Sequence, residues 1–346
     1  MAIKVLVVDD SATARAILVD ILKSDPGIGE VDTAPDAYIA RDKIVKNKPD
    51  VVCLDVEMPR MDGITFLRKL MKHMPLPVVM VSSLTQKGAQ TTLDALESGA
   101  VDFIGKPHSN IYEGSSEIKD ELLSKVKNAA YAHVTKHDTN IQTKHLTYQS
   151  QLETTQKLIA IGASTGGVEA LKEFLMQFPR NSPGMIIVQH MPSNFTKQFA
   201  ERLNSICQVD VKEAENNDTI VQGQVLIAPG DLHMVLRRSG HRYYVQLGSG
   251  EKVSGHRPSV DVMFNSVAKS AGANAIGVIL TGMGSDGAKG LLNMRNSGSM
   301  TFGQDKQSST VYGMPKTAYE NGGVIVQDSL ANLPSKILKH LEKETE

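Results

Sequence analysis

The sequence has little of what would mark several other classes of protein. It contains no tryptophan and only two cysteines, Cys53 and Cys207, which lie in different halves of the chain. Two distant cysteines predict buried free thiols rather than a disulfide, and no cluster of cysteine and histidine has the spacing of a zinc site. A disulfide scaffold and a structural zinc fold are therefore excluded.

An excess of charge and a long hydrophobic run are also missing. Lysine and arginine number 37 against 38 aspartates and glutamates, so no overall basic field favours nucleic acid or a membrane surface. No apolar run approaches the ~20 residues that span a bilayer. The first residues turn acidic at Asp9 after a short apolar stretch, unlike a secretory signal. We expect a cytoplasmic protein that neither binds nucleic acid nor inserts into a membrane.

The most informative feature that is present is a glycine-rich turn around Ser164 and Thr165. The run Leu158–Ile161 before it predicts a buried parallel strand, and the residues after it predict a helix. Such a turn lies at the carboxyl edge of a sheet, where helix N–H groups favour negative charge. A serine there could attack a carbonyl group. The glycine spacing does not match a P-loop, a dinucleotide fold or the α/β-hydrolase motif, so anion binding and an ordinary tight turn stay open.

The first 107 residues alternate short β-branched runs with helical patterns, which predicts a parallel sheet covered by helices on both faces. The 346 residues are enough for a second domain beyond it. The predicted strands are Val5–Val8, Val51–Leu54, Val78–Val81 and Val101–Ile104, and the predicted helices are Ala12–Lys23, Ala37–Lys46, Ile64–His73 and Gly88–Ser98.

Polar residues stand where these strands end: Asp9, Asp10, Asp55, Ser82 and Lys106. Because the carboxyl ends of parallel strands share one edge, three carboxylates should crowd together there and require a hard cation such as Mg2+. With the hydroxyl and the lysine, this group can accept and hold a phosphoryl group. A solvated acidic rim is the simpler alternative.

The segments that carry these residues resemble the receiver domain of bacterial response regulators. The resemblance implies that Asp55 is the phosphorylated aspartate and that Asp9, Asp10 and Asp55 bind Mg2+. It also implies that Ser82 and Lys106 contact the phosphoryl group. The matching segments are Val7–Ser11, Leu54–Gly63, Val81–Ser83 and Gly105–Pro107.

The pattern then changes twice. Residues 117–130 space apolar side chains along one face and predict an amphipathic helix that closes the first domain. The polar stretch that follows predicts a linker. We therefore predict a receiver domain over residues 1–133, a linker over 134–155 and a second domain over 156–346.

In the second domain three strand ends carry Ser164, His190 and Asp286. A hydroxyl, an imidazole and a carboxylate suit a nucleophile, its base and the group that orients the base. His233 and His256 are rival histidines, and sequence alone does not show contact. The predicted strands are Met185–Met191, Val225–Ile227, Met234–Arg238, Arg242–Leu247 and Ala275–Leu280, with a small antiparallel excursion among the shorter ones.

These segments are similar to the chemotaxis protein-glutamate methylesterase, on the motifs Ile161–Gly167, Val188–Pro192, Ala228–Gly230, Gly255–Val260 and Leu280–Gly287. The resemblance implies Ser164 as nucleophile, His190 as base, Asp286 as its orienting group, and oxyanion donors around Thr165 and Met283. It implies hydrolysis of glutamate γ-methyl esters on chemotaxis receptors, with methanol released, and glutamine deamidation as a second activity.

The resemblance also implies regulation. A chemotaxis histidine kinase would phosphorylate Asp55 with Mg2+ and relieve inhibition by the receiver, while the esterase chemistry would need no cofactor. The expected fold class is α/β: a flavodoxin-like receiver followed by a Rossmann-like parallel-sheet esterase domain. The alternative is a response regulator whose second domain only binds a partner as a scaffold.

Overall fold

The computed structural model describes residues 2–82, 86–106, 115–134 and 157–343. The chain divides into two compact units, Met1–Asn140 and Ile141–Glu346. The predicted linker lies outside the described residues except for Val134, and the predicted boundaries at residues 133 and 156 stay predictions. No helix in the described ranges is both long and apolar enough to cross a bilayer.

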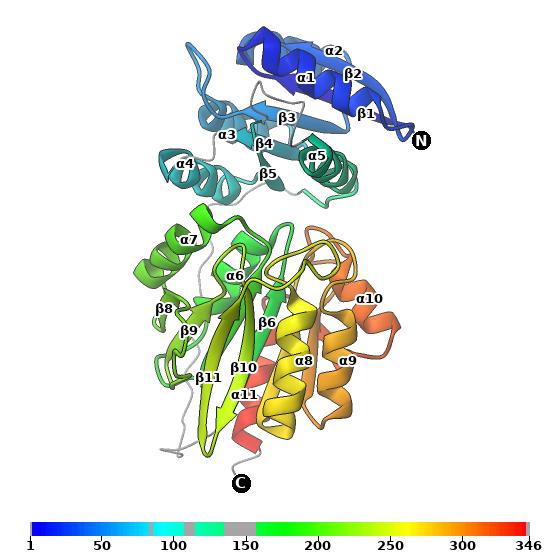
Figure 1. The fold of residues 1–346 in the computed structure, drawn as a ribbon. Helices are drawn as coiled ribbons and strands as arrows, with labels where there is room; N and C mark the ends of the chain where they lie inside the picture. The colour runs from blue at the N-terminus through cyan, green and yellow to red at the C-terminus, as the bar shows by residue number, and fades with distance from the viewer. Residues whose placement is uncertain (1, 83–85, 107–114, 135–156, 344–346) are drawn as a thin grey trace. The chain divides into compact units, whose positions relative to one another are not determined.

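The first unit is a five-stranded parallel sheet with strand order β2-β1-β3-β4-β5 (Figure 1). Apolar side chains of α1 and α5 pack on one face of the sheet, around Leu18, Leu22 and Val126, and the other three helices cover the opposite face. The strands are β1 (Ile3–Val8), β2 (Ile28–Ala34), β3 (Val51–Asp55), β4 (Val78–Ser82) and β5 (Asp102–Gly105). The helices are α1 (Ala12–Lys23), α2 (Ala37–Lys46), α3 (Gly63–His73), α4 (Gln86–Glu97) and α5 (Ser115–Ala129).

Local signals in the sequence set the starts of these helices. The side chain of Ser11 accepts a hydrogen bond from the first turn of α1, and Asp36 does the same for α2. β2 is not predicted by the sequence, because this edge strand is only partly buried and lacks the continuous apolar run of the central strands.

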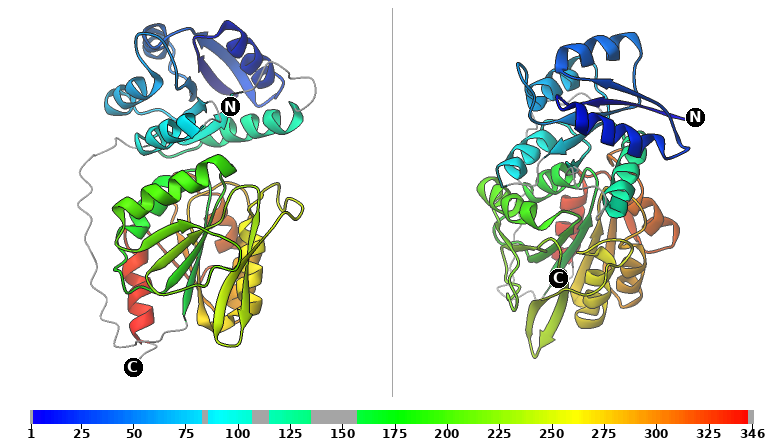
Figure 2. Two further views of the ribbon diagram at one scale, coloured as in Figure 1. Left: turned by 60° about the vertical axis from the view of Figure 1, so that its left-hand side comes forward. Right: turned by 45° about the horizontal axis from the view of Figure 1, so that its top comes forward.

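The second unit is a seven-stranded parallel sheet with order β14-β13-β12-β6-β7-β9-β8, together with an antiparallel hairpin of β10 and β11 (Figures 1 and 2). Its strands are β6 (Leu158–Ala163), β7 (Gly184–Gln189), β8 (Asp210–Glu213), β9 (Gln224–Ile227), β10 (His233–Ser239), β11 (Arg242–Gly248), β12 (Ala275–Ile279), β13 (Met300–Gln304) and β14 (Val326–Asp328). Its helices are α6 (Gly167–Leu175), α7 (Ser193–Ile206), α8 (Val260–Ser270), α9 (Ala288–Asn296), α10 (Met314–Glu320) and α11 (Leu333–Lys343), with a 3-10 turn at Gly272–Asn274.

Both faces of this sheet are covered. The hairpin, α8, α9 and α10 form one core layer with the sheet, with Met234, Phe264 and Leu291 among its buried side chains. The ribbons of α6, α7 and α11 lie on the opposite face (Figure 2). The α/β class and the antiparallel excursion are confirmed. One detail is corrected: Val225–Ile227 belongs to β9, which pairs in parallel with β7 and β8, so the excursion consists of β10 and β11.

Candidate active site and candidate phosphorylation site

Ser164 lies directly after the central strand of the second sheet. Its strand, β6, is paired on one side with β12 and on the other with β7. The N–H of Ser164 donates to the carbonyl of Thr281 (3.0 Å), and the N–H of Gly167 donates back to the carbonyl of Ser164 (2.7 Å). These bonds close the turn between β6 and α6 and fix the backbone of Ser164 at the carboxyl edge of the sheet.

Two glycines, one in this turn and one in the loop after β12, leave no room for a side chain around Ser164. Gly166 has φ +75°, and a Cβ on it would lie 2.5 Å from the Cβ of Thr310. A Cβ on Gly282 would lie 2.8 Å from the Cβ of Ser164. The turn around Ser164 is therefore in tight contact with the two loops that follow β12 and β13.

His190 follows β7, the neighbour of β6. Its N–H donates to the carbonyl of Ala163 (3.2 Å), which aligns the two strand ends. The side chain of Gln189 spans the same gap: its Nε2 donates to the carbonyl of Ser164 (2.9 Å) and to that of His190 (3.2 Å). β7 ends at Gln189, directly before His190. The imidazole therefore lies just beyond the strand, where it can turn toward Ser164.

The three residues at the strand ends form a continuous hydrogen-bonded line. Nδ1 of His190 lies 3.1 Å from Oγ of Ser164, and its Nε2 lies 2.8 Å from Oδ2 of Asp286. A carboxylate can only accept, so Nε2 carries the proton when the imidazole is neutral. Nδ1 is then left with a lone pair directed at the hydroxyl of Ser164. The arrangement can remove a proton from that hydroxyl.

Asp286 is held by the start of helix α8. Besides the imidazole, its carboxylate accepts from Oγ of Ser259 (2.7 Å), from the N–H of Val260 (2.7 Å) and from the N–H of Asp261 (3.0 Å). Burial alone would raise the pKa of Asp286, but the bond and charge of His190 and these donors lower the pKa below its usual value. Asp286 is therefore an anion with a fixed orientation.

Both rival histidines lie beside this line without joining it. His233 donates from Nε2 to the carbonyl of Glu251 (2.8 Å), and its Nδ1 accepts from the N–H of Ser259 (3.2 Å), so it supports the start of α8. The ring of His256 stacks on that of His190, with 3.7 Å between ring centroids and 12° between planes.

The two residues expected near an oxyanion, Thr165 and Met283, flank Ser164. Thr165 is its neighbour in the chain, and its carbonyl accepts from Oγ1 of Thr281 (3.0 Å). Met283 follows Gly282, which packs against Ser164. Thr165 therefore lies at the start of α6 next to Ser164, and Met283 lies in the loop after β12 that packs against Ser164.

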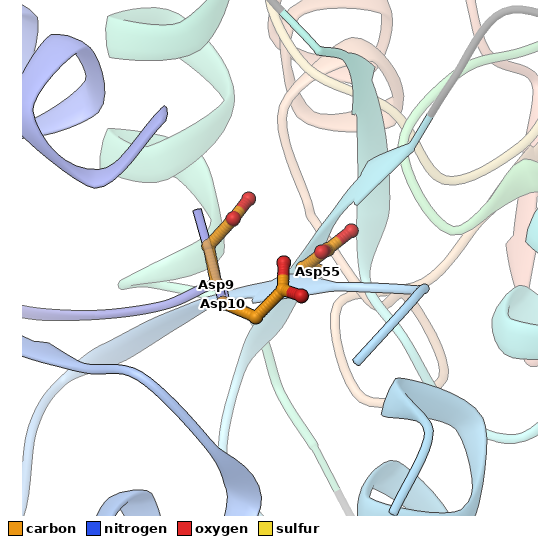
Figure 3. A group of neighbouring side chains, drawn as sticks. All are labelled: Asp9, Asp10 and Asp55. Carbon is orange, nitrogen blue, oxygen red and sulfur yellow. The ribbon is translucent and has the colours of Figure 1, made fainter. Parts of the chain in front are cut away.

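The receiver residues also meet at one edge of their sheet. Asp9 and Asp10 follow β1, Asp55 ends β3, and Lys106 follows β5. Carboxylate oxygens of the three aspartates lie within 4.8 Å of one another (Figure 3). Nζ of Lys106 lies 2.7 Å from Oδ2 of Asp55 and 3.1 Å from Oδ2 of Asp9.

Ser82 ends β4, one residue beyond the partner of Asp55 in the strand register. Its hydroxyl is buried and accepts a hydrogen bond from Oγ1 of Thr92 in α4 (2.8 Å). Ser82 therefore lies at the same edge as the aspartates, and its hydroxyl is engaged with α4.

The charges at this edge compete. Burial raises the pKa of Asp55 to about 6, the ammonium of Lys106 opposes this rise, and the nearby charge of Asp9 adds to it. Burial would lower the pKa of Lys106, but Asp55 and Asp9 raise it above its usual value. Lys106 is therefore a fixed cation, and Asp55 takes up a proton more readily than an exposed aspartate does.

The donor set fits a hard divalent cation. All three groups that could bind such a cation are carboxylates, and Asp10 is exposed to solvent. Oδ2 of Asp9 is buried and makes no hydrogen bond, although Lys106 lies 3.1 Å away as an ion-pair partner. An oxygen with unused lone pairs beside two further carboxylates is a site that Mg2+ can occupy.

Two family models match the chain in the regions just described. The model of the CheB methylesterase matches residues 159–337, and that of the response regulator receiver domain matches residues 5–112. The chain belongs to the CheB methylesterase family. The receiver match comes first in this chain and the methylesterase match follows it.

Relatives within the CheB family match nearly the full length. A protein-glutamate methylesterase/protein-glutamine glutaminase of Sulfurimonas denitrificans is 60% identical over 99% of both chains. A second, from Syntrophus aciditrophicus, is 55% identical over 96% of both chains. The crystal structure of the CheB methylesterase catalytic domain of Thermotoga maritima is 37% identical, with a TM-score of 0.52, and covers 53% of this chain and 97% of that one.

Three residues around the CheB site had no role in the sequence analysis: Gln189, Ser259 and Thr281. Each touches Ser164 or Asp286 through a single hydrogen bond that depends on tertiary structure. Ser259 did carry a signal, because it directly precedes α8 and serine is a favoured N-cap. A capped helix start that also holds a carboxylate cannot be recognised from sequence.

Proposed function

We propose that this chain hydrolyses glutamate γ-methyl esters on chemoreceptors, with Ser164 as the nucleophile, His190 as the base and Asp286 as its orienting group. The observation that carries the proposal is the line from the hydroxyl of Ser164 through both nitrogens of His190 to Asp286. The names of the relatives supply the substrate class.

The chemistry follows the charge of each group. Nδ1 of His190 takes the proton as Oγ of Ser164 attacks the ester carbonyl, and the imidazolium that forms is stabilised by the anionic Asp286. Backbone N–H groups near Thr165 and Met283 would hold the oxyanion. His190 returns the proton to departing methanol, and water then cleaves the acyl-enzyme by the reverse sequence, leaving a glutamate.

The same groups could cleave a glutamine side-chain amide. The acyl-enzyme is identical, and His190 would protonate departing ammonia instead of methanol. The nitrogen of an amide leaves less readily than the oxygen of an ester. Protonation of the leaving group by a correctly placed imidazolium therefore matters more for glutamine. The glutaminase activity in the names of the relatives supports this second reaction.

The receiver would control the esterase. Asp55 would accept a phosphoryl group from a chemotaxis histidine kinase. Lys106 would form an ion pair with the phosphoryl group, and the hydroxyl of Ser82 would turn from Thr92 to contact the same group. Asp9, Asp10 and Asp55 would hold Mg2+, which neutralises charge on the transferred group. Added charge at this edge would bias a two-state contact that otherwise limits the esterase. The proposal places the protein in the cytoplasm, where kinase and receptor glutamates would be found.

Methanol release from methylated chemoreceptor membranes tests the proposal. The full-length chain, with Mg2+ and a small phosphodonor, should release methanol, and Ser164→Ala should lose at least about 1000-fold of the rate. Ser285→Ala is the matched control, because this exposed serine lies in the loop beside Asp286 and should leave the rate unchanged. Equal release from wild type and Ser164→Ala would refute the assignment. No release from either would favour the scaffold alternative.

A further inference from the structure

The ring of His256 covers one face of the ring of His190 and has no part in the reaction described above. The two planes are nearly parallel, at 12°, and the ring centroids are 3.7 Å apart. The edges of His190 are already used, because its two nitrogens face Ser164 and Asp286. His256 therefore adds a contact of another kind, to the face of the base rather than to its edge.

A tight turn holds His256 in this place. Val253 and His256 exchange two backbone hydrogen bonds, of 3.1 Å and 3.0 Å, and so close a two-residue loop. Both loop residues have positive φ, +54° at Ser254 and +81° at Gly255. This is the geometry of a type I′ turn, which fixes the direction of the residues on either side.

The residues around the turn are tied to the rest of the domain. Nη1 of Arg257 donates to the carbonyl of Gly250 (2.9 Å), and the carbonyl of Arg257 accepts from the N–H of Asp231 (3.3 Å). On the other side, the carbonyl of Glu251 accepts from Nε2 of His233 (2.8 Å). The backbone that carries His256 is therefore fixed without any help from His190.

Two hydrogen bonds at the edges of a ring fix where its nitrogens lie, but they resist tilting of the ring plane only weakly. A parallel ring at van der Waals distance opposes that tilt. It also offers the imidazolium a π-face at the moment His190 takes the proton, an attraction that the neutral ground state lacks.

We propose that His256 is a positioning residue for the base. Its ring holds the plane of His190 between Ser164 and Asp286 and stabilises the cation that forms there during the reaction. The inference rests on the proposed function, since it gives His190 the role of base. It predicts a loss in kcat rather than in KM, because His256 acts on the base and not on the substrate.

The test compares three variants of the full-length chain, assayed for methanol release with Mg2+ and a small phosphodonor. His256→Ala should lower kcat about 3- to 30-fold, the range of a cation–π contact, and leave KM unchanged. His256→Phe keeps a ring at the same place and should recover kcat to within about 3-fold of the wild type. His241→Ala, in the exposed turn of the β10–β11 hairpin, is the control and should not alter kcat.

The proposal is overturned if His256→Ala keeps the wild-type kcat, if it changes KM alone, or if His256→Phe is as slow as His256→Ala. Thermal unfolding shows whether each variant is folded. A second readout needs no activity: the ring proton of His190 should carry an upfield ring-current shift in the NMR spectrum, present with His256→Phe and lost with His256→Ala. An unchanged shift in the alanine variant would also overturn it.

Failure of the proposed function gives a different pattern. In that case the wild type itself releases no Ser164-dependent methanol, while the ring-current shift still reports whether the two rings stack. If the wild type is active and only the His256 variants behave unexpectedly, the inference fails and the proposed function stands.

Discussion

At the scale of single residues, the carboxylate of Asp286 shows how a buried charge is kept in place. It is only 1% exposed, yet it accepts hydrogen bonds from Ser259, Val260 and Asp261 as well as from His190. The free N–H groups at the start of a helix favour an anion. The start of α8 therefore fixes the charge that orients the imidazole.

Ser259→Ala should weaken this arrangement without removing it. One of four hydrogen bonds to Asp286 is lost, and a bond to a charged group contributes about 1.5–3 kcal/mol. We expect turnover to fall about 10-fold, and stability to fall by about 1 kcal/mol because Ser259 also caps α8. Methanol release and thermal unfolding measure the two effects.

Ser266→Ala is the matched control on the same helix. Its hydroxyl accepts from the N–H of Leu236 (2.8 Å), far from Asp286 in the hydrogen-bond network. Stability should fall while turnover stays at the wild-type value. Equal turnover in Ser259→Ala and the wild type would show that the helix backbone alone holds Asp286.

Asp55 should make Mg2+ binding depend on pH. Its pKa of about 6, raised mainly by burial, means that protons compete with the metal below that pH. We expect the affinity for Mg2+ to be about 10-fold lower at pH 5 than at pH 7.5, measured by titration calorimetry on the full-length chain. In Asp55→Asn the remaining affinity should vary much less. Equal wild-type affinity at both pH values would contradict the prediction.

The same shift has a consequence for folding. Asp55 binds its proton more tightly in the folded chain than an unperturbed aspartate, whose pKa is 3.8, so its ionisation costs folding free energy. In the absence of metal, its contribution to stability is full below about pH 4 and is lost as the pH rises to about 6.

At the scale of elements, the turn between β6 and α6 is the most constrained piece of the second unit. Gly166 is in the left-handed region and touches Thr310 from the loop after β13. Any side chain there would push the start of α6 away from Ser164. The turn is therefore fixed both by its own dihedral angles and by what packs against it.

Gly166→Ala should remove most of the activity while the domain still folds. Gly240→Ala is the control, since Gly240 also has positive φ, +60°, but a Cβ added there would meet no atom within 4 Å. The control should lose about 1–2 kcal/mol of stability and no activity. Gly166→Ala should lose more stability and most of its methanol release. Comparable activity in the two variants would show that the turn tolerates displacement.

Most elements could be predicted because their signals are local. The limits of α1 and α2 follow from their polar caps and apolar periodicity, and the central strands follow from their continuous apolar runs. The strands β2, β8, β13 and β14 were not predicted. Exposed positions interrupt the apolar pattern of β2 and β8. β13 contains threonine, glycine and glutamine, and β14 has only three residues, so neither shows an apolar run.

The candidate site divides in the same way. Residues at strand ends, such as Ser164 and Asp55, could be placed at a sheet edge from the strand pattern. The stacking of His256 on His190 could not, because it depends on a loop after β11 that no periodicity describes. Neither could the reach of Gln189 to Ser164, which depends on side-chain direction.

At the scale of the whole molecule, the receiver and the esterase each have their own hydrophobic core. The Thermotoga maritima catalytic domain, to which the second unit is similar, is known as a separate structure. We therefore expect residues 156–346 to fold without the receiver.

Deleting residues 1–155 should raise basal methanol release if the unphosphorylated receiver inhibits. Coupling between sites of about 1–3 kcal/mol corresponds to a rise of about 5- to 150-fold. Asp55→Asn is the control, because it keeps the receiver but removes the carboxylate that we propose is phosphorylated, and its basal rate should stay low with or without a phosphodonor. A truncated enzyme slower than the full-length chain would mean that the receiver activates instead.

The placement of Ser164, His190 and Asp286 after three adjacent strands has a consequence for how the enzyme fails on heating. β12, β6 and β7 lie side by side in the middle of the seven-stranded sheet. Amide protons of such central strands exchange with solvent through openings close to the global unfolding of a domain, whereas edge strands open earlier. The amide protons of β12, β6 and β7 should therefore be among the last to exchange. Local opening of β8 or β14 should leave the enzyme active, and activity should be lost only when the whole domain unfolds.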